Sequence, residues 1–256
     1  MRVAVHATST IGKRALRVLQ GEPHVTEAGF WGPEETEGKT PTINDLRSVD
    51  VLVAEKIPPK SLVEAALETR THLVVAANEG GDLGSSFAAE GISLVLGANP
   101  AAGLACCLAA QEAAFMDEPL EVRLAWTVPG RLRRRGEAIP FPDPVGSMWA
   151  RPTDAVGWVQ RDIPVQAFAA PLESSWQAAM AQVSGAVDDG VQRTIVGTAD
   201  DGEFLAAIAL AAAVVPTGQH AYGPGMCWVA EAPSPYLDRA LAGGIDVASY
   251  HDRTSA

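Results

Sequence analysis

The sequence predicts an α/β protein: a Rossmann-like, mostly parallel sheet with an inserted, mainly antiparallel α+β second domain. Two observations predict this fold class. Over residues 1–118, short apolar runs alternate with stretches of helical spacing, the pattern of a parallel sheet covered by helices. Over residues 119–200, polar and apolar residues alternate as in antiparallel strands, and residues 201–256 return to helices and a loop that we expect to pack on both parts.

The expected elements of the first part follow one another at short intervals. The run 2–6 is apolar enough for a buried strand, and residues 12–20 place their apolar side chains on one helical face. The same criteria predict strands at 25–31, 49–54, 72–77 and 92–96, and helices at 61–69 and 101–115.

The second part contains a hairpin signal. Residues 176–187 and 191–198 are strand-like and flank the turn residues Asp188, Asp189 and Gly190. A helix is expected from 203 to 215, and a loop rich in glycine and proline follows it.

The turn after the first strand stands where a dinucleotide-binding protein has its glycine-rich loop. Ala7, Ser9 and Gly12 occupy the three glycine positions of G-x-G-x-x-G, so only the glycine that packs helix on strand is present. The turn opens a helix, whose free N–H groups favour an anion, and its hydroxyls are suited to phosphate oxygens. An ordinary helix cap explains the same residues equally well. The candidate cofactor-binding residues of this turn are Thr8, Ser9, Thr10, Ile11 and Gly12.

The end of the second strand bears on the cofactor. An NAD-binding chain usually has an acidic residue there for the ribose hydroxyls, whereas this chain has Trp31 followed by Gly32 and Pro33. Trp31 is suited to stacking on adenine or to simple packing. If NAD(P) binds, the missing acidic residue favours NADP over NAD. The incomplete glycine loop is also compatible with a protein that binds no cofactor.

Two further groups of residues are candidates for the site. Asn78 and Asn99 follow successive predicted strands, at the edge where open α/β sheets bind ligands, and Asn99 also suits a helix N-cap. His220 and Tyr222 share a glycine-rich loop, where they are candidate proton donors or parts of a structural loop. We expect a pocket between the two parts that brings together Thr8, Asn78, Asn99, and His220 or Tyr222.

Three regions resemble the saccharopine dehydrogenase-like reductases. These are the strand–helix–strand stretch around 49–54 and 71–75, the run 99–105 with its Asn-Pro-Ala-Ala-Gly-Leu-Ala sequence, and the strand 189–197 with the turn at 201–204. The order of a Rossmann half, a small sheet and a short return also resembles the dihydrodipicolinate reductases, whose His-His-x-x-Lys run this chain lacks. The resemblance implies the two-domain architecture and NAD(P) chemistry, without naming a substrate.

Composition limits the partners. A net charge of −12 disfavours nucleic acid and anionic membranes, and the absence of a long apolar run or a signal peptide predicts a cytoplasmic protein. The five histidines and three cysteines have no metal-site spacing. Arg131, Arg133, Arg134 and Arg135 form either a solvated patch or a clamp for carboxylate or phosphate.

The expected function is therefore that of an NAD(P)H-dependent reductase acting on a C=N, C=C or C=O bond of a small metabolite, in a homodimer or homotetramer. The alternative keeps the fold without the redox step. It is either a cofactor-independent cyclase or isomerase, or a metabolite-binding protein.

Overall fold

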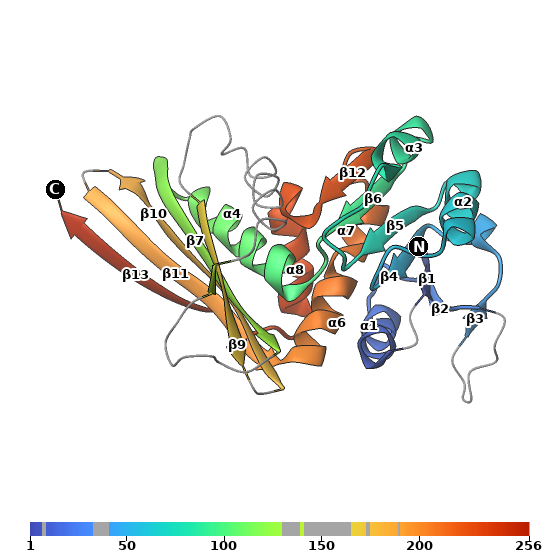
Figure 1. The fold of residues 1–256 in the computed structure, drawn as a ribbon, viewed down its shortest axis with the longest axis horizontal. Helices are drawn as coiled ribbons and strands as arrows, with labels where there is room; N and C mark the ends of the chain where they lie inside the picture. Colours follow the sequence, from blue (N-terminus) through green and yellow to red (C-terminus); the bar gives the residue numbers. More distant parts are fainter. Residues whose placement is uncertain are drawn as a thin grey trace.

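The computed structural model describes residues 1–6, 9–32, 41–129, 139–140, 165–172, 175–188 and 190–255. Two sheets stand side by side with a layer of helices between them, and two more helices cover the far side of one sheet (Figure 1). The predicted α/β architecture with a second, mainly antiparallel part is confirmed.

Seven parallel strands form the first sheet, called sheet A. In chain order they are β1 (Arg2–His6), β2 (Glu27–Trp31), β3 (Thr42–Ile43), β4 (Val51–Ala54), β5 (His72–Val75), β6 (Ser93–Leu96) and β12 (Gly225–Trp228). Their spatial order is β12-β6-β5-β4-β1-β2-β3. β4, β5 and β6 are buried at every residue, as expected for strands covered on both faces.

Helices cover both faces of sheet A. On one face lie α1 (Thr10–Gln20), α4 (Cys106–Ala113), α6 (Gly202–Ala212) and α8 (Pro233–Ala242), and on the other lie α2 (Lys60–Thr69) and α3 (Leu83–Ala89) (Figure 1). Side chains alternate accordingly: Val3 and Val5 of β1 join the core with α1, α4 and α6, whereas Ala4 joins the core with α2 and α3. Among the described helices, none is both long and apolar enough to cross a bilayer.

The second sheet, called sheet B, has six strands in the order β13-β11-β10-β7-β9-β8. They are β7 (Glu118–Pro129), β8 (Ile139–Pro140), β9 (Val165–Leu172), β10 (Trp176–Val187), β11 (Gly190–Asp201) and β13 (Ala248–Ser255). Only β7 and β9 pair in parallel among the described strands of this sheet. The predicted hairpin is confirmed as β10 and β11, and Ala179, Ala181 and Val183 of β10 face the shared core.

The return segment is more than helices and a loop. Residues 225–228 are β12, which extends sheet A, and residues 248–255 are β13, which pairs with β11 at the edge of sheet B. Both strands are short or polar and carry no clear alternation, so the sequence pattern did not indicate them. β12 has a consequence for the site, because the loop that leads into a parallel strand lies at the amino edge of its sheet.

Candidate functional site

The carboxyl ends of β1, β2 and β4 mark the point at which the strand order of sheet A reverses. β1 pairs in parallel with β2 on one side and with β4 on the other. The chain builds outward to β3, then returns to β4 and continues to β6. Because ligands of open parallel sheets bind in the crevice at such a reversal, the topology puts the candidate site here.

Helix α1 begins at this edge. Ser9 is its N-cap: the backbone is extended, and the Ser9 hydroxyl accepts a hydrogen bond from the Gly12 N–H at 3.2 Å. The first turn holds no acidic residue, so the positive end of the helix dipole is not offset within the helix itself. Gly12 is buried. The cap interpretation of Ser9 is thus confirmed, and contact of Thr10 and Ile11 with a phosphate stays a prediction.

A cavity of about 300 Å³ opens at the ends of these strands. Trp31, the last residue of β2, forms an aromatic wall, and His6, the last residue of β1, forms a polar one. Burial lowers the pKa of His6, which favours the uncharged form of its imidazole. The cavity is lined by His6, Ser9, Trp31, Glu55, Lys56, Ile57, Pro58 and Pro59.

Ser9 and Glu55 are in contact inside this cavity. Glu55 is the first residue after β4, and its Oε1 accepts a hydrogen bond from the Ser9 hydroxyl. Ser9 thereby accepts from the helix and donates to the carboxylate at the same time. A negative side chain therefore stands beside the N-terminus of α1, where a dinucleotide-binding protein holds its pyrophosphate.

Asn78 and Asn99 meet at the carboxyl edge of β5 and β6, as predicted, but neither is among the residues that line the cavity. The Asn99 amide nitrogen donates to the Ala76 carbonyl at 2.6 Å and to Asn78 Oδ1 at 2.7 Å. A backbone carbonyl only accepts, so the Asn99 amide has one orientation, and the Asn78 atom facing it must be the oxygen. The two N–H groups of Asn78 are left to donate to an acceptor atom of a ligand.

The backbone after Asn99 is a π-helical turn, η2 (Pro100–Ala105), which continues into α4. Such turns are rare and often mark functional sites. Glycine is required within it: a Cβ at Gly103 would stand 2.5 Å from the Gly97 carbonyl oxygen and 2.9 Å from the Tyr236 hydroxyl. This close approach is the physical reason for a glycine in the predicted Pro-Ala-Ala-Gly-Leu run.

His220 and Tyr222 do not reach this edge, so their predicted place in the pocket is wrong. The His220 ring lies 5.1 Å from that of His72, the first residue of β5. Tyr222 is buried; its carbonyl accepts from the hydroxyl of Ser93, the first residue of β6, and its own hydroxyl donates to the Val229 carbonyl. Both residues lead into β12 and are therefore at the amino edge, across the sheet from Asn78. Burial raises the pKa of Tyr222 well above its ordinary range, which also makes it a poor acid.

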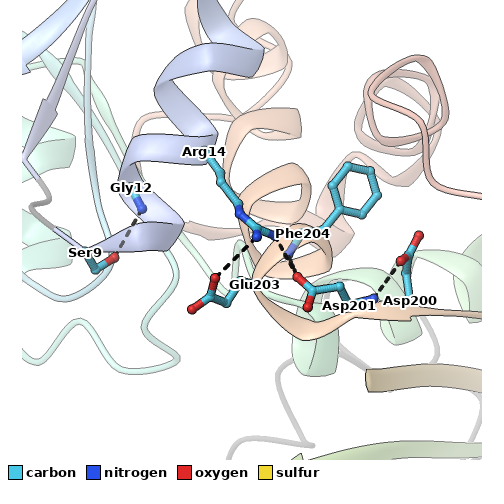
Figure 2. A network of polar contacts seen from close by, with 7 residues as sticks. All are labelled: Ser9, Gly12, Arg14, Asp200, Asp201, Glu203 and Phe204. Atoms are coloured by element: carbon cyan, nitrogen blue, oxygen red, sulfur yellow. Dashed lines mark hydrogen bonds and ion pairs between the residues drawn. The ribbon is translucent and has the colours of Figure 1, made fainter. Parts of the chain in front are cut away.

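Arg14 is engaged between the two parts of the chain and is not free for a phosphate. It pairs with Asp201 at 2.6 Å and with Glu203 at 3.5 Å (Figure 2). Asp201 is the last residue of β11 and the N-cap of α6, where its carboxylate accepts from the Phe204 N–H at 3.0 Å. That hydrogen bond, and then the one from Arg14, lower the pKa of Asp201. The contact ties the start of α1 to the point where the chain leaves sheet B.

Several residues of the cavity were not among the predicted site residues. Glu55, Lys56 and Ile57 follow β4 directly, and the strand-end rule that selected Asn78 and Asn99 would have selected them too. Thr8 and the arginines at 131 and 133–135 lie outside the described residues. Within the described residues, no three His, Cys, Asp or Glu side chains form a metal site.

No protein-family model matches the chain, and no curated protein matches it. Solved structures do match. An engineered D-amino acid dehydrogenase bound to NADP+ has a TM-score of 0.60 at 15% identity, over 94% of this chain and 98% of its own. The C. glutamicum DAP dehydrogenase in complex with DAP has a TM-score of 0.56 at 15% identity, over 94% of this chain and 98% of its own.

A dipicolinate-bound dihydrodipicolinate reductase from Paenisporosarcina sp. TG-14 has a TM-score of 0.53 at 12% identity, over 90% of this chain and 98% of its own. The chain has the fold of these dehydrogenases and reductases. The resemblance to dihydrodipicolinate reductases is thereby confirmed in architecture.

Proposed function

We propose that this protein is a reductase that uses NAD(P)H to reduce a C=N, C=C or C=O bond of a small metabolite. The observation that carries the proposal is the cavity with an aromatic wall beside the N-terminus of α1, at the strand-order reversal. The folds of the similar solved structures, all nearly full-length matches, support it.

The residues present suit a dinucleotide laid along the strand ends. Trp31 and Ile57 offer apolar surface for adenine, and the N-terminus of α1 suits the pyrophosphate. β5 stands three strand spacings from β2, roughly 14 Å away, and ends near Asn78. The free N–H groups of Asn78 are then suited to the nicotinamide carboxamide or to an acceptor oxygen of the substrate.

The nicotinamide, when bound, supplies the hydride. The chain's part is to orient cofactor and substrate and to exclude water from the strand ends. Asn78 is the described side chain best suited to orient an acceptor oxygen there. We assign no proton transfer to His220 or Tyr222, since both lie at the opposite edge of the sheet.

We infer a preference for the phosphorylated cofactor from Lys56. This exposed lysine lines the same cavity as Trp31, where a 2′-phosphate on the adenosine ribose would meet a positive charge. Lys56→Glu is expected to weaken NADPH binding about tenfold more than NADH binding. Equal weakening of both would contradict this assignment.

One observation favours the second candidate, a cofactor-independent enzyme or metabolite-binding protein. The hydroxyl of Ser9 is already bonded to Glu55, so the pyrophosphate position carries a negative charge of the protein's own. In this alternative the cavity takes an uncharged or cationic metabolite.

A calorimetric titration distinguishes the two candidates. The purified chain is titrated with NADH, NADPH, NAD+ and NADP+, and Trp31→Ala serves as the variant that removes the aromatic wall. The reductase proposal expects saturable binding of at least one dinucleotide, weakened at least tenfold by Trp31→Ala. No binding of any of the four at millimolar concentration would favour the second candidate.

A further inference from the structure

The hydrogen bonds of Ser9 leave it without a proton for a ligand. A serine hydroxyl has one O–H donor and two acceptor lone pairs. Ser9 gives its proton to Glu55 and takes the Gly12 N–H on its oxygen. A phosphate offers only acceptor oxygens, so Ser9 can bind one only after its bond to Glu55 is broken.

The charge of Glu55 acts in the same direction. Its carboxylate lies on the cavity wall, next to the N-terminus of α1. Of the cations closest in sequence to α1's start, Arg14 is engaged by Asp201 and Glu203, and Lys13 is exposed on the helix. A pyrophosphate that approached this helix end would therefore meet a like charge, which the helix dipole and Lys56 on the same cavity wall offset only in part.

We infer that Glu55 is the residue that sets the affinity of this site for a pyrophosphate. In the free protein it takes the place of the phosphate at the N-cap of α1, and a dinucleotide must displace it. This inference rests on the proposed function.

A competing role for Glu55 makes the opposite prediction. Carboxylates at strand ends accept hydrogen bonds from ribose hydroxyls in dinucleotide-binding sheets, and Trp31 replaces the usual acid at the end of β2. If Glu55 bound the ribose, its loss would weaken the binding of adenosine as well as that of dinucleotides.

The test is a calorimetric titration of the full chain and of Glu55→Gln, which removes the charge and keeps an acceptor for Ser9. Glu55→Ala removes both the charge and the acceptor. Ligand binding to this second variant is also measured, so that the test stands if Glu55→Gln fails to fold. Glu64→Gln, on α2 and outside the cavity, is the control with the same change in net charge. The probes are NADPH, NADH and phosphate-free adenosine, and thermal unfolding verifies that each variant folds.

We expect Glu55→Gln and Glu55→Ala to bind NADPH and NADH about tenfold more tightly than the unmodified chain. Adenosine binding should change less than twofold, and Glu64→Gln should match the unmodified chain. If the Glu55 variants bind a dinucleotide and the unmodified chain does not, the result would support the inference and overturn the proposed function of the natural chain.

A different result is that the unmodified chain binds a dinucleotide and both Glu55 variants bind it equally or more weakly. This result would overturn the inference and leave the reductase proposal standing. Weaker adenosine binding would assign Glu55 to the ribose instead. If neither the unmodified chain nor the variants bind a dinucleotide, both proposals fail.

Discussion

His72 is a buried side chain whose protonation links the stability of the fold to pH. It is the buried first residue of β5, and its Nδ1 accepts the Ser93 N–H at 3.1 Å, which only an imidazole unprotonated at Nδ1 can do. Burial, and then the nearby His220, lower the pKa of His72, while Asp50 opposes them. An unfolded histidine titrates near pH 6.5, so the unfolded chain binds more protons below that pH.

We therefore expect the contribution of His72 to the free energy of unfolding to be fully present above pH 6.5 and to be lost as the pH drops below it. His72→Gln keeps an acceptor for Ser93 and should remove up to about 1.4 kcal/mol per pH unit from the slope. Urea unfolding between pH 5.5 and 7.5 measures both slopes. His6, whose pKa burial lowers, and Glu112 and Glu231, whose pKa values burial raises, contribute to the slope that remains. Equal slopes in the two proteins would refute the assignment to His72.

At the scale of residues, the strand-end rule was the reliable guide to the site. It placed Asn78 and Asn99 at one edge of the sheet, where the structure brings them into contact, although neither lines the cavity, and it would have found Glu55, which does. His220 and Tyr222 were chosen by residue type and by their flexible setting. The edge of the sheet at which they lie depends on β12, whose four residues stand in a stretch rich in glycine and proline.

Helix α1 packs on sheet A and begins at the candidate site. Two of the glycine positions of the dinucleotide-binding fingerprint, Ser9 and Gly12, have different roles at its start. Ser9 caps the helix, whereas Gly12 is buried within it. Ser9→Gly should cost only a few tenths of a kcal/mol, because glycine is a tolerable N-cap. Gly12→Val adds a branched side chain to a packed position and should cost about 1–3 kcal/mol. Urea unfolding compares them, and equal losses would contradict these roles.

Regular elements could be read from the sequence where periodicity was long. β10 and β11 pair over twelve residues each with a tight turn, and their alternation was plain. The π-helical turn after Asn99 could not be predicted, because its apolar spacing merges with that of α4, and the close approach of other segments to Gly103 is visible only in the folded chain. β13 is an exposed edge strand, so no apolar face marked it.

At the scale of the whole molecule, sheet B has a face that the described helices leave uncovered (Figure 1). β7, β10, β11 and β13 turn alternate residues to that face, among them Met180, Ile195 and Tyr250, of which Tyr250 is 62% exposed. Two pairs of opposite charge lie on it: Arg193 stands opposite Asp252, and Arg123 pairs with Glu121. On a chain with a net charge of −12, a locally neutral apolar face is where two copies can approach with least repulsion.

We predict that a second copy of the chain packs on this face. Met180→Asp combined with Tyr250→Asp should shift sedimentation from the dimer to the monomer at micromolar concentration. Leu241→Asp, at an exposed apolar residue of α8, is the control and should leave the dimer intact. A monomeric unmodified chain, or equal dissociation by the control, would contradict this interface.

Hydrogen exchange tests most directly whether a nicotinamide dinucleotide binds at the strand-order reversal of sheet A, as we propose. Amide exchange is measured on the full chain with and without saturating NADPH. We expect slower exchange at the start of α1 and in residues 55–59, with no change in the loop around His220. Unchanged exchange at α1 and residues 55–59, or protection confined to the His220 loop, would contradict it.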